Sequence, residues 1–558
     1  MRPQSYRLAE TILRESVMDP KQQQAQFQFT HKQIVLGLVA VFAVYGTMAC
    51  FLQTTTIARP KIAADLDGMS LYSWSISIPG LAGAFATLIF GKFSDMYGRR
   101  IMLLLSLVFF LLGAIISAIS PNYVVLIGAN SLARIGSGSV MMLGYSVLGD
   151  MFLPAERSKW IGLLNIPAGV FALFGPTIGG WFVDNLSWRH LYWMSVPLLI
   201  ACLVLVAVGI PRLSKKVAHR IDIRGCLLVA VASSSTILGL SLAGTAYPWT
   251  SVQVMGLLGI SLLFWILFLR AEGVAEEPIL DPQVLHNRTF ITVAAATLIS
   301  FFGQIGMTMY FPMFLQGVQG LSAMRSGQIV TPYSVLMAFL GVPVGFLLGR
   351  TKRYRWMYIL GFGILTADMF GVIFFTAKTP AGWSVITAML AGLGLGAIPT
   401  VNTMVVQNAV PKRLLGVAMG AIFFSISMGM ALSPAILGSA MNATYARKLA
   451  VSLPDGLRNM ADEATLVSLG NPRVLLSQPA LAELKERFAA SGGERLFQQT
   501  IQAIRTSMEA GLRSVFWIAA ITMLLSFLLI STVPEISMDA EVREKKVLES
   551  SVEPVAAD

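Results

Sequence analysis

Few charged residues lie within the apolar runs of this chain, and the most regular charged group follows the second run. There, Gly91, Asp95, Gly98, Arg99 and Arg100 lie in one short segment. A carboxylate in such a turn can pair with nearby basic residues or with the positive N-terminus of another helix, and Gly91 permits close approach of a neighbour. We expect a latch that joins two parts of the protein and must break for opening. The alternative is a simple anchor that fixes the orientation of the chain.

Three further charged residues lie in or at the ends of apolar runs. Arg134 costs ~2.5–3.5 kcal/mol on insertion scales, so it should face protein or a water-filled cavity. Its charge either responds to proton or substrate occupancy or is structural and satisfied by carbonyls and amides. Asp368 is the only carboxylate well inside a run, where a low dielectric favours the neutral form. It is a candidate proton carrier or a hydrogen-bonded structural acid, and Asp150 is a second candidate for proton coupling.

Small residues and a proline cluster in the fifth run, at Gly175, Pro176, Gly179 and Gly180. Proline kinks a helix, and small residues let helices approach closely. We expect a bent, tightly packed helix that blocks leakage, or else ordinary small-residue packing.

The remaining reactive side chains argue against an enzyme. The four histidines fall outside the apolar runs and the three cysteines lie in apolar stretches, so no metal-ligand spacing or disulfide framework is visible. No Ser-His-Asp or Cys-His arrangement and no phosphate-binding loop appears. We therefore expect no enzymatic activity, no metal, no cofactor and no direct use of ATP.

The composition indicates which elements must position these residues. Of 558 residues, 55% are hydrophobic and 13% are charged, and the mean hydropathy is +0.70, which excludes soluble and disordered chains. A helix that spans a bilayer needs ~20 apolar residues. The sequence predicts fourteen such runs, at about 34–55, 72–92, 101–119, 123–148, 160–182, 191–210, 225–245, 252–270, 290–315, 326–349, 356–377, 383–408, 415–440 and 512–533.

Basic residues gather in the short loops on the side that holds both termini. The positive-inside rule therefore places both termini in the cytoplasm. The net charge of +12 is assigned to basic loops beside anionic lipid rather than to nucleic-acid binding.

The runs divide as six, two extra and six, as in a transporter built from two similar halves. The predicted parts are a cytoplasmic tail (1–32), a six-helix half (33–210), a linker with two extra helices (211–271), a second six-helix half (290–533), a long extracytoplasmic loop within it (441–511) and a cytoplasmic tail (534–558). Apolar residues at helical spacing predict two amphipathic helices in the long loop, the second entering the last span. The loop is either a solvated cap or a docking surface for a periplasmic adaptor protein.

Three of these segments resemble signatures of the major facilitator superfamily. Residues 91–100 closely resemble motif A, and residues 132–138 resemble motif B, whose arginine is Arg134 here. Residues 175–180 resemble motif C, which is associated with antiporters.

One branch of that superfamily, the fourteen-span drug:proton antiporters, is similar over residues 188–197 and also over 310–322 and 407–411. The chain departs from the usual patterns as well. Residues 51–57 lack the usual acid of the first span, Ser137 replaces a Gln and Phe171 replaces a Gly. The missing acid puts the usual proton-coupling or cation-binding site in doubt.

The resemblance implies an all-α integral membrane protein of the major facilitator type, with 14 transmembrane helices arranged as 6+2+6. It implies multidrug efflux: export of lipophilic or amphipathic small molecules by proton antiport with alternating access. An importer or facilitator of a specific metabolite is one alternative, and a membrane sensor or adaptor-interaction protein is another. The expected setting is a bacterial inner membrane, with protons and a small-molecule substrate as partners and the monomer as the functional unit.

By the same resemblance, the first, fourth, ninth and twelfth spans line a central cavity. Their Met and aromatic side chains make an adaptable apolar wall, and a few amides and hydroxyls would orient a ligand. No acid is in this set, so strong selection for cations is not expected. The candidates are Gln53, Thr54, Met141, Gln304, Tyr310, Asn402 and Gln407.

Overall fold

The computed structural model describes residues 31–67, 71, 74–152, 154–210, 222–243, 247–275, 278–321, 323–454 and 493–535. These residues are almost entirely helical, because backbone groups in a bilayer must be hydrogen-bonded within the segment. Within them, eleven helical stretches are long and apolar enough to cross a membrane. The elements are α3 (His31–Asp65), α4 (Trp74–Tyr97), α5 (Arg99–Ala118), α6 (Tyr123–Met151), α7 (Pro154–Asn185), α8 (Arg189–Gly209), α9 (Ile223–Leu242), α10 (Val252–Glu272), α11 (Pro282–His286), α12 (Arg288–Ile305), the π-helical turn η2 (Gly306–Tyr310), α13 (Phe311–Gly317), α14 (Ala323–Phe339), α15 (Gly341–Thr351), α16 (Arg355–Val372), α17 (Ala381–Ala409), the short 3₁₀ turn η3 (Lys412–Leu414), α18 (Leu415–Ser452) and α22 (Gly493–Ser531).

Side-chain caps set the starts of several helices. The Asn122 and Asn287 side chains accept hydrogen bonds from backbone N–H groups in the first turns of α6 and α12, at 2.9 and 3.0 Å. Asp222 and Ser251 do the same for α9 and α10. Each cap satisfies a backbone donor that has no partner inside the helix.

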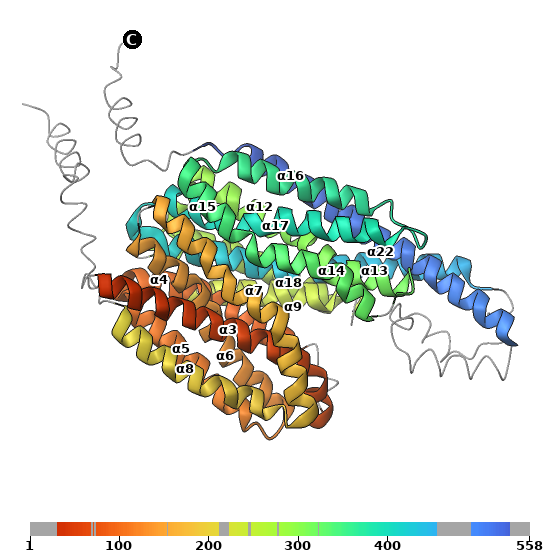
Figure 1. Ribbon diagram of the computed structural model, residues 1–558, viewed down its shortest axis with the longest axis horizontal. Helices are drawn as coiled ribbons and strands as arrows, with labels where there is room; N and C mark the ends of the chain where they lie inside the picture. Colours follow the sequence, from red (N-terminus) through yellow and green to blue (C-terminus); the bar gives the residue numbers. More distant parts are fainter. Residues whose placement is uncertain are drawn as a thin grey trace, which may run out of the picture.

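Two groups of helices repeat the same packing pattern (Figure 1). In the first group, α3 packs on α7 and α8, α6 on α4 and α5, and α5 on α8. In the second group, α12 packs on α18 and α22, α17 on α14 and α16, and α16 on α22. Each helix of the first group thus has a counterpart in the second, in the same chain order.

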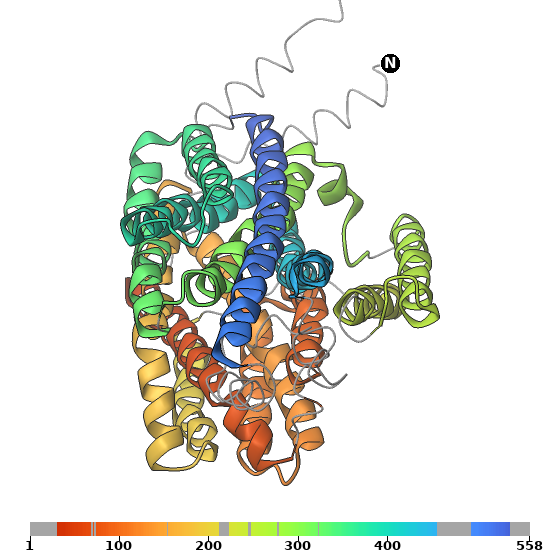
Figure 2. The ribbon, with the colours of Figure 1, turned by 90° about the vertical axis from the view of Figure 1, so that its right-hand side faces the viewer.

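The two groups meet along two matching contacts, which we call the seam. One is α4 against α18, and the other is α7 against α14 and α15. Helices α9 and α10 pair with each other on the flank of the bundle (Figure 2), where α9 contacts both α4 and α18. The Trp249 indole N–H also donates a hydrogen bond to the Ser439 hydroxyl of α18.

The structure differs from the predicted runs at three places. Run 290–315 is interrupted by the π-helical turn η2, which directly precedes the helix that carries Pro312 near its start. Proline lacks a backbone N–H and disturbs regular helix bonding ahead of it. Run 326–349 is divided into α14 and α15 at Leu340.

The third difference is that α18 continues to Ser452 and α22 already begins at Gly493. These extensions pack against each other, with the backbone of Gly511 next to Met441 and Tyr445. The second amphipathic helix expected in segment 441–511 therefore forms and runs into the last helix. The first, around residues 481–488, lies outside the described residues, as do most of both predicted tails and the linker at 211–221.

Candidate functional site

A buried charge cluster is built around the turn between α4 and α5. Gly98 takes a left-handed backbone conformation with φ 91°, which glycine adopts without strain. This turn brings Arg99, 7% exposed, back against Asp95 at 2.5 Å. Arg99 also donates to Asp150 of α6 at 2.9 Å and to the Ser94 hydroxyl at 2.5 Å. One guanidinium thus joins three helices of the first group.

Asp95 extends this cluster across the seam. Its carboxylate accepts the backbone N–H groups of Gly416 at 3.0 Å and Val417 at 2.8 Å, in the first turn of α18. These donors have no partner within their own helix and carry the positive end of its dipole. The two groups are therefore held together here by Asp95, at what we call the Asp95 end of the bundle.

Glycine makes this contact sterically feasible. A Cβ atom at Gly91 would lie 2.6 Å from the Gly416 carbonyl oxygen and 3.0 Å from the Gly420 Cα. Arg100, the last residue of the motif, is half-buried and forms no ion pair with the described residues.

The other half of the seam is also closed at the Asp95 end. Gly162 of α7 lies against the backbone of Gly341, and Gly345 lies against the backbone of Ser158, so no side chain fits at either glycine. The seam is therefore made of close backbone contacts on both sides.

Gln407, predicted to line the central cavity, lies in the seam instead and is 5% exposed. Its Oε1 accepts from Arg157 of α7 at 3.1 Å, and its Nε2 donates to the Tyr145 carbonyl at 3.0 Å. Arg157 also donates to the Gly149 carbonyl at 2.6 Å. Sequence reasoning missed Arg157, because nothing in the sequence separates it from the other basic loop residues.

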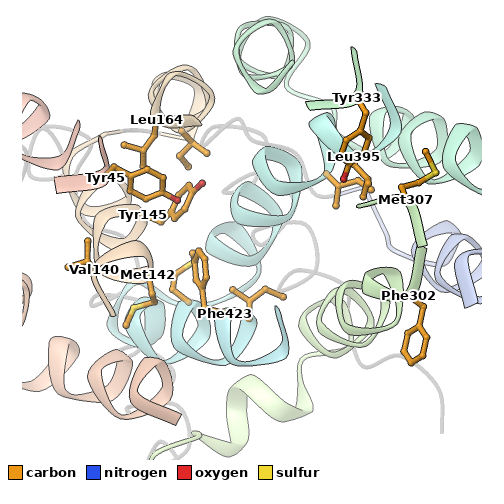
Figure 3. Packing of buried hydrophobic residues seen from close by; sticks show 14 of the residues in the cluster. Tyr45, Val140, Met142, Tyr145, Leu164, Phe302, Met307, Tyr333, Leu395 and Phe423 are labelled. Atoms are coloured by element: carbon orange, nitrogen blue, oxygen red, sulfur yellow. The ribbon is translucent and has the colours of Figure 1, made fainter. Parts of the chain in front are cut away.

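Aromatic packing continues the seam toward the middle of the bundle (Figure 3). The Tyr145 ring meets Tyr45 of α3 edge-on at 5.9 Å and Phe423 of α18 at 5.5 Å. Tyr145 thus contacts the second group with its ring and through its carbonyl.

Arg134 lies far from this cluster along α6 and faces a cavity inside the first group. The cavity is lined from α3, α4, α6 and α8 by Phe51, Leu52, Thr55, Arg59, Ile62, Ser75, Pro79, Tyr123, Leu126, Asn130, Arg134 and Tyr192. Arg59 is a second guanidinium in this lining, and sequence reasoning did not single it out.

The glycines of the fifth run pack α7 against α3. A Cβ atom at Gly175 would lie 2.6 Å from the Gln53 Cβ, and one at Gly179 would lie 2.6 Å from the Thr54 carbonyl oxygen. Gly180 has no such neighbour within 4 Å, and the side chain of Pro176 lies outside the described residues. The close packing involves only one face of the motif.

Asp368 is 5% exposed and lies between α16 and α17, not in the cavity of the first group. It contacts the Thr387 hydroxyl, while its Oδ2 has no hydrogen-bond partner among the described residues. Asp150, in contrast, forms an ion pair with Arg99.

Several other residues predicted to line the central cavity are engaged within the second group. The Asn402 side chain accepts from the Tyr358 hydroxyl at 2.6 Å and donates to Thr297 at 2.8 Å. The Tyr310 hydroxyl donates to the Pro434 carbonyl at 3.2 Å, and the Gln304 amide approaches the Met337 sulfur at 4.0 Å.

In the first group, the Thr54 hydroxyl donates to the Cys50 carbonyl of its own helix at 2.8 Å. Met141 and Gln53 are half-buried, and Met141 packs on the main core. The structure therefore does not gather the seven candidates around one space.

Known proteins match most of the chain. At 29% identity over 472 residues, it is similar to the multidrug transporter protein MdtP of Bacillus subtilis, over 82% of this chain and 85% of that protein. At 26% identity over 501 residues, it is similar to multidrug resistance protein 3 of the same organism, over 89% and 94% of the two chains. The fold matches the proton:xylose symporter XylE with a TM-score of 0.57 at 11% identity, over 93% of this chain and 100% of that structure.

The family model described as the Major Facilitator Superfamily matches residues 37–434, more than half of the chain. This family and its fold are those of multi-pass membrane transporters, not enzymes. The chain belongs to the Major Facilitator Superfamily.

Proposed function

We propose that the chain exports lipophilic or amphipathic small molecules by proton antiport, with alternating access between two six-helix halves. The observation that carries this proposal is the Asp95 contact with α18, because it joins the two groups only through hydrogen bonds to Gly416 and Val417. Such a contact can break and re-form without any loss of helix. The names of the two relatives, multidrug transporter and multidrug resistance protein, support efflux as the direction.

The proposed topology has fourteen spans as 6+2+6, with both termini in the cytoplasm of a bacterial cell and the Asp95 end facing inward. On this topology, the structure represents a state closed toward the cytoplasm. Opening inward requires Asp95 and Gln407 to release α18 and Arg157. Arg99 would retain Asp150 as a partner, so its charge stays compensated within the first half.

Two residues are proposed for proton coupling. Asp368 is 5% exposed and has a carboxylate oxygen with no hydrogen-bond partner among the described residues, which leaves that oxygen available to a proton. Arg134 would respond to what occupies its cavity. Asp150 is a poorer candidate, because its carboxylate is already paired with Arg99.

Proton movement in everted membrane vesicles tests this function. The wild type, Asp368→Asn and a control, Glu535→Gln at an exposed site, are each given lipophilic cations, neutral drugs and organic anions. Compound-triggered proton release in the wild type and the control is expected. Its loss in Asp368→Asn protein that still binds the compound assigns the carrier to Asp368.

Proton release that survives Asp368→Asn would keep antiport but return Asp368 to a structural role. Absence of release with every compound, while a radiolabelled substrate still moves, would overturn antiport and favour a facilitator.

A further inference from the structure

The cavity inside the first group has an unusual charge balance. Its lining contains two arginines, Arg59 and Arg134, and no carboxylate. Both guanidinium groups belong to residues that line this one cavity. Two like charges repel, and the low dielectric of a helical bundle strengthens that repulsion.

The part of the chain that the structure describes supplies neither arginine with a counter-charge. Among the described residues, Arg59 and Arg134 form no ion pair and donate no hydrogen bond. Two buried arginines of the described residues behave differently, because Arg99 has two carboxylates and Arg157 has carbonyl and amide acceptors. A hydrogen-bond acceptor from outside the protein would supply Arg59 and Arg134 with the partner that they lack.

The neutral polar groups of the lining also favour a ligand that accepts hydrogen bonds. The Asn130 oxygen already accepts from the Tyr192 hydroxyl at 3.4 Å and from the Ser117 hydroxyl at 3.3 Å, which leaves its amide nitrogen as the available donor. The Thr55 hydroxyl donates to the Phe51 carbonyl at 2.6 Å. Arg59, Arg134 and the Asn130 amide therefore have N–H groups with no hydrogen-bond acceptor among the described residues.

The size and the apolar part of the lining restrict the ligand further. The cavity measures about 50 Å³, which is room for a small polar group and not for a whole drug-sized molecule. Phe51, Leu52 and Leu126 provide an apolar wall around it. A compound with an anionic head and an apolar body meets both conditions.

We propose that this cavity receives the carboxylate, or a similar anionic group, of a lipophilic acid, and that Arg59 and Arg134 thereby select organic anions as substrates. This proposal rests on the proposed export function and names its substrate class.

Equilibrium binding to the purified full-length protein in lipid nanodiscs tests the site without requiring transport. The probes share one fluorescent body: pyrenebutyrate, its neutral methyl ester and the corresponding pyrenebutyl-trimethylammonium cation. The variants are Arg59→Gln, Arg134→Gln and, as a matched control, Arg505→Gln, which removes an exposed arginine of α22. Binding of the methyl ester by each variant shows that it is folded.

The wild type and the Arg505→Gln control should bind pyrenebutyrate about 10- to 100-fold more tightly than the ester, as expected for hydrogen bonds to a charged group. Each cavity variant should lose most of that margin while its affinity for the ester stays within about twofold, since only the charged contacts are removed. Equal binding of the acid and the ester by the wild type would overturn the proposal. So would an acid preference that survives in both cavity variants.

The failure of this proposal differs from the failure of the export proposal. If the ester triggers proton release in vesicles but the acid is not preferred in nanodiscs, the anion site is wrong and export stands. If the acid is preferred but no compound moves protons, the site stands and antiport is wrong.

Discussion

Arg99 and Arg134 belong to the same group of helices, yet their surroundings differ in one decisive respect. Arg99 contacts Asp95 at 2.5 Å and Asp150 at 2.9 Å, whereas the cavity around Arg134 contains a second arginine and no acid. Arg99 is buried and Arg134 is half-buried, and a charge removed from water must be compensated. Where the protein compensates it, the charge holds helices together, and where the protein does not, the site is left for a ligand.

This contrast separates two kinds of region in one fold. The Asp95 end is closed by contacts within the protein. The Asp95 carboxylate binds the N-terminus of α18, the Gln407 amide binds the Arg157 guanidinium, and glycines pack against the backbone of the facing helix. The cavity of Arg59 and Arg134 has donors in excess and apolar walls. The first region is suited to holding two halves in one arrangement, and the second to binding something that comes and goes.

The largest effect is expected from removing Asp95. Asp95→Ala leaves the N–H groups of Gly416 and Val417 without their acceptor and removes one carboxylate from Arg99. Breaking a buried pair costs about 3–5 kcal/mol, so transport should fall by more than about tenfold. Vesicle transport at matched protein levels measures this, with the exposed Asp65→Ala as control. Transport near the wild-type rate would show that the seam does not depend on Asp95.

A smaller effect is expected from overfilling the seam. Gly91→Ala would place a Cβ atom 2.6 Å from the Gly416 carbonyl oxygen, whereas Gly180→Ala meets no such neighbour within 4 Å. Overpacking costs about 1–3 kcal/mol. Thermal unfolding should therefore begin at a lower temperature in Gly91→Ala than in Gly180→Ala. Equal unfolding temperatures would mean that α4 and α18 can move apart to admit the methyl group without a loss in the free energy of unfolding.

The smallest of these effects belongs to Gln407. Gln407→Ala removes its bonds to Arg157 and to the Tyr145 carbonyl, but Arg157 keeps the Gly149 carbonyl as an acceptor. The expected loss in the free energy of unfolding is about 1 kcal/mol. It should appear as a modest fall in the unfolding temperature, with the exposed Gln502→Ala as control. An equal fall in the unfolding temperature for Gln407→Ala and Asp95→Ala would contradict this ranking, because it would show that Gln407 stabilises the seam as much as Asp95 does.

The sequence predicts the parts of this contrast that depend on local patterns. Long apolar runs predict the helices, and the spacing of Gly91, Asp95 and Arg99 indicates a charged turn that can reach a helix N-terminus. The partner itself, the first turn of α18 at Gly416, is more than 300 residues away in the chain, and no local pattern identifies it.

Other features depend on which way a side chain faces in the assembled bundle. Gln407 was predicted to line a cavity, but the register of α17 turns it toward Arg157. Arg59 looks like an ordinary basic residue near a helix end, and only the packing of α3 against α6 and α8 places it beside Arg134. A span assignment for α18 ends too early, because its extension is stabilised by α22 rather than by lipid.

The most direct test of the contrast is thermal unfolding of Arg99→Gln and Arg134→Gln side by side, in nanodiscs and without ligand. We predict that Arg99→Gln lowers the unfolding temperature, because Asp95 and Asp150 lose their counter-charge, at a cost of about 3–5 kcal/mol. Arg134→Gln should not lower it, because it removes an uncompensated charge. Pyrenebutyrate should then stabilise the wild type and not Arg134→Gln. An equal loss of stability in both variants would contradict the account, since it would show that Arg134 is held by the protein itself.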